Sequence, residues 1–162
     1  MQPEFSLALL QIAGQRGLHR AVETCGYAPW DVYEKMLPHT ELFLFDCKET
    51  DPVRHARFTG VDPSLIMQNL KNLHDSGARI LLRCPLIPGC NDREDHFTAL
   101  ARLCEKLPRL EGIELLPYHA LGASKAERLG MNVQPRFETP SKEQVAQWNN
   151  RMKALGAPVI DS

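Results

Sequence analysis

Ionisable residues stand where short apolar runs of this sequence end. Five of them could do chemistry together: Glu23, Asp46, Lys48, Arg83 and His119. Basic side chains such as Lys48 and Arg83 hold a carboxylate, and acids such as Glu23 and Asp46 hold an ammonium group or a small cation. The sequence has no G-x-G-x-x-G and no P-loop, so it lacks the glycine loops that cradle phosphates. This mixture of charges predicts a zwitterionic, amino-acid-like ligand rather than a polyanion.

Each of these residues also has a purely structural interpretation. Glu23 and Asp46 could cap the following helices, or pair with Lys48 or Arg83. Arg83 could be held in a partly buried ion pair, a role that favours arginine. A lone histidine such as His119 is often only a hydrogen-bonded part of the fold. The sequence leaves these alternatives open.

The cysteines and the other histidines give a weaker signal. The five cysteines are spread out, and no two have the two-residue gap of a zinc ribbon or redox motif. We expect reduced thiols that are buried or half-buried. Cys25, Cys47 and Cys84 stand at the same strand ends, where a nucleophile or a metal cluster is the alternative. The remaining histidines are expected at the surface: 19, 39, 55, 74 and 96.

Helical and strand patterns alternate along the chain and would position these residues. Apolar spacing predicts helices over 4–16, 29–38 and 63–77, a helical turn after residue 51, and helices after residues 92 and 139. In the first helix, Phe5, Leu9, Ile12 and Ala13 fall on one face. Short apolar runs predict strands at 18–23, 42–45, 80–82 and 113–116, with 158–160 as a final short strand.

Such alternation is typical of a parallel sheet whose strands are covered on both faces. Right-handed crossovers put the carboxyl ends of all parallel strands on the same side of the sheet. That side is the usual binding face of α/β folds. We therefore expect the five ionisable residues to meet on one rim.

The overall composition is that of one soluble globular domain, residues 1–162. Of these 162 residues, 43% are hydrophobic and 24% are charged, with a formal net charge of −1. This balance argues against a nucleic-acid or anionic-membrane surface. No apolar run approaches the roughly 20 residues needed to span a bilayer, and residues 1–4 do not resemble a secretory signal. We expect a cytoplasmic protein with no nucleic-acid or membrane partner.

Taken in order, the strand-end segments resemble the glycyl-radical-enzyme activating enzymes. This is the radical S-adenosylmethionine family that includes pyruvate formate-lyase activating enzyme. The likeness covers nearly the whole chain, and the combination of LLPYH with a following LG-x-x-K is its most specific part. The matching segments are ETCGY at 23–27, LFDCK at 44–48, HARFTGV at 55–61, RCPLIPGCN at 83–91, ELLPYHALG at 114–122 and LG at 129–130.

The resemblance implies an α/β fold, namely a partial (β/α) barrel with parallel strands that lacks the first two βα units of a (β/α)6 radical-SAM barrel. It implies reductive cleavage of S-adenosylmethionine at a [4Fe-4S] cluster, followed by hydrogen abstraction from a backbone glycine. The implied partners are a glycyl radical enzyme of the formate acetyltransferase type and a flavodoxin-like electron donor. The implied pocket for S-adenosylmethionine is lined by Glu23, Asp46, Lys48, Arg83 and His119.

Two motifs of the family are missing from the sequence. The C-x3-C-x2-C loop, whose thiolates hold the cluster, does not occur, and Cys84 and Cys90 are the closest pair, with five residues between them. The G-G-E-P motif does not occur either. We therefore expect the carboxyl-terminal portion of a longer protein, inactive on its own. Its first strand would be an unpaired edge, which predicts a dimer, a local covering element or aggregation.

Two other functions stay open. A cluster-free hydrolase or isomerase would use His119 with Asp46 or Glu23 as a base, and its turnover would not require iron. A non-catalytic fragment would bind neither S-adenosylmethionine nor a metal. In that case alanine at Asp46 or Arg83 would change only stability.

Overall fold

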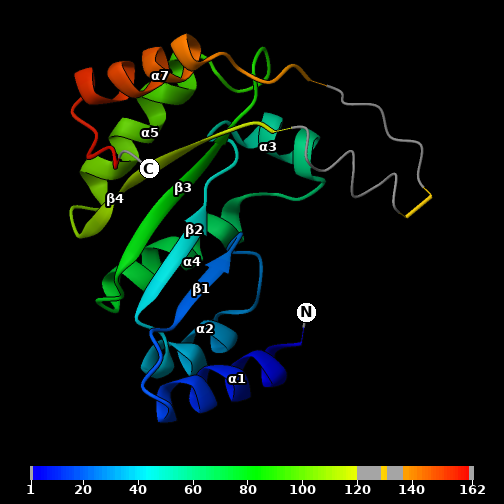
Figure 1. The fold of residues 1–162 in the computed structure, drawn as a ribbon, viewed down its shortest axis with the longest axis vertical. Helices are drawn as coiled ribbons and strands as arrows, with labels where there is room; N and C mark the ends of the chain where they lie inside the picture. The colour runs from blue at the N-terminus through cyan, green and yellow to red at the C-terminus, as the bar shows by residue number, and fades with distance from the viewer. Residues whose placement is uncertain (1, 120–128, 131–136, 161–162) are drawn as a thin grey trace.

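The computed structural model describes residues 2–119, 129–130 and 137–160, and in them a four-stranded parallel sheet dominates (Figure 1). The strands lie side by side in chain order, β1-β2-β3-β4. Helical segments connect each strand to the next, as parallel pairing requires. The predicted parallel α/β architecture is confirmed. The strands are β1 (Ala21–Thr24), β2 (Leu42–Asp46), β3 (Ile80–Leu86) and β4 (Leu110–Pro117).

The helices follow the predicted order, with small shifts of their ends. The helical turn expected after Asp51 is a full helix, which the Asp51 side chain caps by accepting a hydrogen bond from the Arg54 amide at 2.8 Å. The last helix starts with a capping box between Ser141 and Gln144. The helical elements are α1 (Pro3–Gln15), α2 (Trp30–Met36), η1 (Leu37–His39), α3 (Pro52–Thr59), α4 (Ser64–Asp75), α5 (Glu94–Lys106) and α7 (Lys142–Ala154).

Helices cover one face of the sheet, which corrects the expectation that the strands are buried on both faces. Along β2 and β3 burial alternates residue by residue. Phe45 and Leu82 belong to the core cluster, together with Leu70 of α4 and Leu100 of α5. The intervening residues, such as Arg83, point to the other face and are only half-buried. The sheet therefore has a packed face and an open face.

The strand ends differ from the sequence prediction in three places. β1 begins at Ala21 rather than at residue 18, and the side chain of Leu18 is exposed. β3 continues through Pro85 to Leu86, and β4 begins at Leu110. The expected strand at 158–160 forms a single parallel bridge to β4, with its backbone hydrogen-bonded to Ile113 at 2.9 Å on both sides. This segment partly covers the outer edge of β4.

Three of the histidines expected at the surface are buried instead: His55, His74 and His96. Each has a hydrogen-bond partner, which is the usual condition for burying a polar group. For example, Nδ1 of His55 lies 3.1 Å from the carbonyl oxygen of Val61. Such partners depend on how the chain folds back on itself, so the sequence pattern did not indicate them.

None of the helices in the described parts of the chain combines the length and the apolar character needed to cross a membrane.

Candidate functional site

Three of the predicted residues come together on the open face of the sheet. Asp46 and Arg83 are directly paired in the register of β2 and β3. Glu23 is paired with Leu44, two residues before Asp46. Residues two apart on a strand, and partners in register, project from the same face. Glu23, Asp46 and Arg83 therefore line one side of the sheet, as predicted.

Arg83 is the centre of this group. Its Nη1 lies 3.0 Å from Oε2 of Glu23, and its Nε lies 3.4 Å from Oε2 of Glu114, which is its partner in the register of β3 and β4. The side chains of Arg83 and Glu114 are each 19% exposed, whereas that of Glu23 is 63% exposed. The ion pair between Glu23 and Arg83, one of the structural alternatives, is thus present.

The guanidinium of Arg83 keeps hydrogen-bonding capacity. Its Nε is buried and donates no hydrogen bond to any described residue, because the contact with Glu114 is an ion pair without hydrogen-bond geometry. A buried N–H without a partner is costly. A ligand carboxylate or a water molecule at this position would satisfy it.

Sequence reasoning missed Glu114. The residue stands between Ile113 and Leu115, both of which are buried. An acidic residue inside an apolar strand needs a partner for its charge, and this feature of the sequence could have indicated that Glu114 belongs to the site. Its partner, however, depends on the register between two strands, which the sequence alone does not give.

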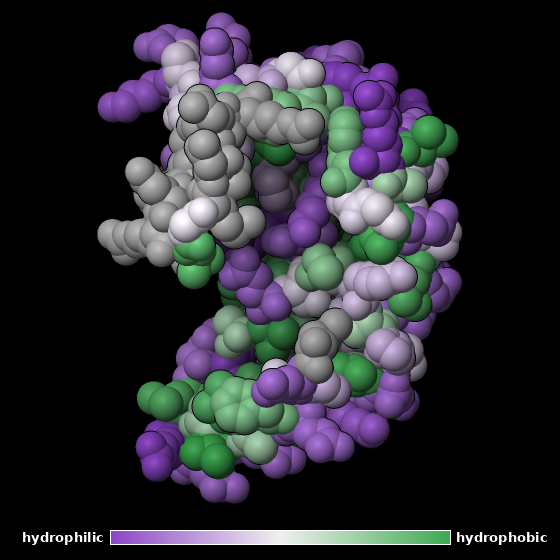
Figure 2. All heavy atoms as spheres, turned by 90° about the vertical axis from the view of Figure 1, so that its right-hand side faces the viewer, coloured by the Kyte–Doolittle hydropathy of each residue, from purple (hydrophilic) through white to green (hydrophobic). Residues whose placement is uncertain are grey.

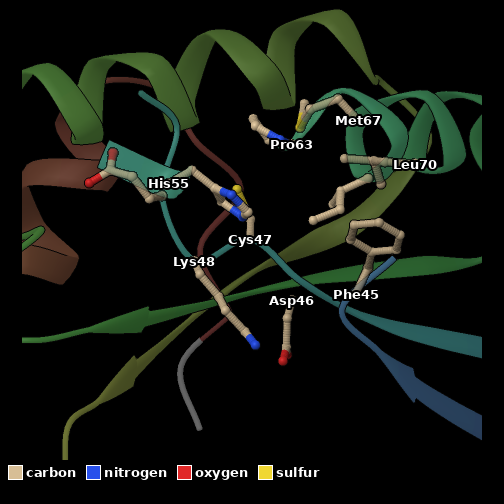
Figure 3. Close-up of a pocket in the computed structure, with 10 residues that line it drawn as sticks. Phe45, Asp46, Cys47, Lys48, His55, Pro63, Met67 and Leu70 are labelled. Atoms are coloured by element: carbon tan, nitrogen blue, oxygen red, sulfur yellow. The ribbon is translucent and has the colours of Figure 1, made fainter. Parts of the chain in front are cut away.

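Asp46 and Lys48 extend to the same side at the end of β2, opposite to Phe45 and Leu70 (Figure 3). Burial raises the pKa of Asp46 above its usual value, and the charge of Glu23 adds to this effect. The positive charges of Lys48 and Arg83 oppose the rise without cancelling it. A further cation beside Asp46 would therefore stabilise its ionised form.

The backbone at Lys48 is fixed by Asn91, the last residue of the RCPLIPGCN segment. The Asn91 amide nitrogen donates to the carbonyl oxygens of Lys48 and Pro85, both at 2.8 Å. The Ile87 amide donates to the Asn91 side-chain oxygen at 2.8 Å. Asn91 is buried, so these bonds join the end of β2 to the end of β3.

A hollow opens beyond these strand ends, and Figure 2 shows hydrophilic side chains on its floor. Lys48, Pro85, Ile87 and Asn91 line it, together with Arg54 and Phe58 of α3. Of the five predicted residues, Lys48 lines this hollow, so the hollow adjoins the group around Arg83 through Lys48.

A buried network supports the chain directly after Lys48. Oε2 of Glu49 lies 3.0 Å from Nη1 of Arg93, and Oε1 of Glu49 accepts hydrogen bonds from the amides of Thr50 and Asp51 at 2.8 and 3.0 Å. Burial alone would raise the pKa of Glu49, but the Arg93 and backbone hydrogen bonds lower it overall. Nδ1 of His96 lies 2.7 Å from the Thr50 hydroxyl. The sequence analysis did not identify this network.

His119 stays outside the group that the structure brings together. It follows β4 by two residues and is exposed. Among the described residues no interaction joins it to Glu23, Asp46 or Arg83. A pocket role for His119 remains a prediction, and so does a hydrolase that would use it with one of these acids.

The cysteines do not fit an iron–sulfur cluster. Cys47, Cys84 and Cys104 are buried, and burial raises the pKa of Cys104 to about 11 and that of Cys84 well above its usual value. A thiolate is needed to bind iron or to attack as a nucleophile. In the described parts of the chain no three His, Cys, Asp or Glu side chains are placed to hold a metal ion. The alternative of a cluster of Cys25, Cys47 and Cys84 is therefore not supported.

Comparisons with known proteins give activating enzymes among the relatives of this chain. No protein-family model matches the chain. The chain is 41% identical over 165 residues to the isethionate sulfite-lyase activating enzyme of Nitratidesulfovibrio vulgaris, a match that covers 99% of this chain and 51% of that protein. The crystal structure of a domain of pyruvate-formate lyase-activating enzyme from Bacteroides vulgatus matches with a TM-score of 0.80 and 31% identity, over 98% of this chain and 90% of that one.

A radical SAM methyltransferase from Sphaerobacter thermophilus shares the fold alone, with a TM-score of 0.62 and 17% identity over 90% of this chain and 41% of that one. The chain spans about half the length of the curated relatives it matches, and it corresponds to their carboxyl-terminal portion. The partial barrel and the resemblance found in the sequence are confirmed by these matches. The chain belongs to the glycyl-radical-enzyme activating enzymes.

Proposed function

We propose that this chain provides the S-adenosylmethionine-binding part of an activating enzyme, and that Glu23, Asp46, Lys48 and Arg83 bind the amino-acid end of the cofactor. The observation that carries the proposal is the pairing of Asp46 with Arg83 on the open face of the sheet, with Glu23 beside them. Arg83 and Lys48 would bind the carboxylate, and the acids would bind the ammonium group. His119 is proposed as a further pocket residue.

The charge of the site supports this cofactor. Glu23, Asp46 and Glu114 contribute three negative charges on the strands, and Lys48 and Arg83 contribute two positive ones. Arg54 and Arg57, which line the adjoining hollow, add two further positive charges. S-adenosylmethionine carries an ammonium and a sulfonium cation and one carboxylate, so groups of both signs would bind it. Its cations would stabilise the ionised form of Asp46, which burial disfavours.

The chemistry of the whole protein is part of the same proposal. In this family the cofactor supplies the radical when it is cleaved at a [4Fe-4S] cluster, and the five cysteines of this chain do not fit such a cluster. This chain's own residues would bind and orient the cofactor, and the chain alone would not be active.

The proposed partner is a glycyl radical enzyme. The relatives reported above are named for isethionate sulfite-lyase and for pyruvate formate-lyase, so they support the class of partner and not one member of it. An enzyme of the formate acetyltransferase type, a flavodoxin-like electron donor and a cytoplasmic location complete the proposal.

The test measures binding of S-adenosylmethionine to this chain by isothermal titration calorimetry, without iron. We expect saturable binding that Asp46→Asn weakens about tenfold or more, since a hydrogen bond to a charged group contributes about 1.5–3 kcal/mol. Glu111→Gln is the matched control, because Glu111 lies at the opposite end of β4 and pairs with Arg79. No binding by the unchanged chain, or equal losses in both variants, would contradict the proposal.

A further inference from the structure

Two cysteines form a pair on the packed face of the sheet, directly behind the candidate site. Cys47 follows Asp46 at the end of β2, and Cys84 lies within β3. The register pairs Asp46 with Arg83, so the next residues, Cys47 and Cys84, stand opposite each other. The Cys47 amide donates to the carbonyl oxygen of Arg83 at 2.7 Å, which extends the strand pairing to this position. Since side chains alternate between the faces of a sheet, both thiols point into the core.

The geometry of this pair suits a disulfide bond. Neighbouring strands lie about 4.8 Å apart, and the Cα atoms that a disulfide joins are usually about 4.4–6.8 Å apart. The thiols of Cys47 and Cys84 already form a hydrogen bond with each other. Both residues are reduced in this structure, and both are buried. The two sulfur atoms can therefore be joined without moving the strands that carry them.

A small cavity gives one of the two thiols access to small molecules. Its volume is about 10 Å³, which is room for about one water molecule. Cys47 and His55 both line it, and of the five cysteines, all of which belong to the described part of the chain, only Cys47 does so. Figure 3 shows Cys47 and His55 on the same side of the strands, with Asp46 on the other. Cys47 is therefore the thiol that a small oxidant reaches first.

His55 is arranged to take a proton in this cavity. Its Nδ1 lies 3.1 Å from the carbonyl oxygen of Val61, which only accepts hydrogen bonds. In the neutral ring Nδ1 therefore carries the hydrogen, and Nε2 is the nitrogen that accepts a proton. A histidine that accepts a proton from a neighbouring cysteine is the usual means of activating a thiol. Burial raises the pKa of Cys84 well above its usual value, so Cys84 is suited to the second step and not to the first.

We propose that Cys47 and Cys84 are a peroxide-sensitive thiol pair that closes to a disulfide behind the cofactor-binding residues. Cys47 gives its proton to His55, and its sulfur attacks one oxygen of hydrogen peroxide. The O–O bond breaks, Cys47 becomes a sulfenic acid, and the departing hydroxide takes the proton from His55 as water. The Cys84 sulfur then attacks the Cys47 sulfur, and hydroxide leaves with the Cys84 proton as a second water. Two thiols lose two electrons, and one peroxide is reduced to two waters. This modification does not depend on cofactor binding, so it and the proposed function fail separately.

The experiment treats the reduced chain with hydrogen peroxide, alkylates the remaining thiols in denaturant and measures the intact mass. The untreated chain should take up one label on each of its five cysteines, and the treated chain should take up two fewer. Peptide mapping should then join Cys47 to Cys84. Cys90 shares a tryptic peptide with Cys84, so the mapping is repeated in Cys90→Ser to make the assignment unique. Full labelling after treatment, a bond to another cysteine, or a bond between two molecules would overturn the proposal.

Three substitutions separate the steps. Cys84→Ala should leave Cys47 as a sulfenic acid, which dimedone traps. Cys104→Ala is the matched control, because Cys104 is another buried cysteine of the same core and should not be needed for the disulfide. His55→Gln should slow disulfide formation about tenfold or more, since a general base contributes at least that much. Loss of the disulfide in Cys104→Ala, or an unchanged rate in His55→Gln, would contradict the proposal.

Discussion

At the scale of single residues, His96 is a histidine that the fold keeps neutral. It is fully buried, and burial lowers its pKa below 6.5 although the charge of Glu49 acts in the opposite direction. Its Nδ1 bonds the Thr50 hydroxyl, and its Nε2 has no partner among the described residues. Protonation would therefore place a charge in the core beside Arg93.

The first prediction follows from this histidine. Its folded-state pKa is lowered, so below about pH 6.5 the unfolded chain takes up a proton that the folded chain does not. The free energy of unfolding should fall as the pH falls from 7 to 5.5. His96→Asn should flatten this dependence in urea titrations, whereas His19→Asn, at an exposed position, should leave it unchanged. If the free energy of unfolding of His96→Asn still fell with pH as in the unchanged chain, His96 would not be the cause of the pH dependence.

Single residues also show how far the sequence predicts the site. Glu23, Asp46 and Arg83 were predictable because charged residues next to apolar runs stand out, and their meeting follows from parallel strands. Glu114 was not, since its role comes from its register with Arg83. The ion pair between Arg93 and Glu49 was not predictable for the same reason. Glu49 is a buried residue of the loop after β2, far from Arg93 in the sequence. Long-range pairing, rather than residue type, limits the prediction.

At the scale of elements, Asn69 ties α4 to the chain after β1. Its amide nitrogen donates to the carbonyl oxygens of Gly26 and Ala28, both at 2.8 Å, and the side chain is buried. Gly26 itself has a φ of 77°, and a Cβ there would lie 2.3 Å from Phe45. The ETCGY segment is therefore shaped by close packing, in addition to its acidic residue.

A second prediction concerns this tie. Asn69→Ala removes two buried hydrogen bonds: the carbonyl oxygen of Ala28 loses its Asn69 partner, while that of Gly26 keeps the bond from the Ala28 amide. The change should therefore lower the free energy of unfolding by about 2 kcal/mol. Asn72→Ala is the control in the same helix, because the Asn72 side chain accepts a hydrogen bond from the exposed side chain of Gln68, and its backbone bonds to Ser76 are kept in the variant. Asn72→Ala should lower the free energy of unfolding by less than about 0.5 kcal/mol. Chemical denaturation followed by circular dichroism measures both, and equal losses would contradict the assigned role of Asn69.

The elements themselves were largely predictable from the sequence. Apolar runs identified all four strands, and helical spacing identified the helices between them. The strand ends were less predictable: the apolar run predicts a strand over 80–82, whereas β3 extends to Leu86. In the structure β3 runs through Pro85, which is in register with Leu116 of β4. A proline removes one donor from the ladder but does not have to end a strand.

At the scale of the whole molecule, a third prediction concerns iron. Within residues 2–119, 129–130 and 137–160 no three His, Cys, Asp or Glu side chains are placed to hold a metal ion, and burial raises the pKa of Cys84 and Cys104. Anaerobic treatment with iron and sulfide should give no stoichiometric four-iron cluster, and S-adenosylmethionine should stay uncleaved. Iron analysis and chromatography of the nucleoside products measure this. Robust cleavage by this chain would show that the site has been assigned wrongly.

The two edge strands of the sheet differ in how far they are covered, and this difference limits how many molecules can associate through their sheets. The outer side of β4 is partly closed by residues 158–160, whereas the outer side of β1 pairs with no other strand in the described part of the chain. A filament forms only when every molecule has two complementary binding surfaces, one for each neighbour. A molecule that accepts a neighbour on one side only stops after a single addition, so even at high concentration it should give discrete pairs in place of fibres.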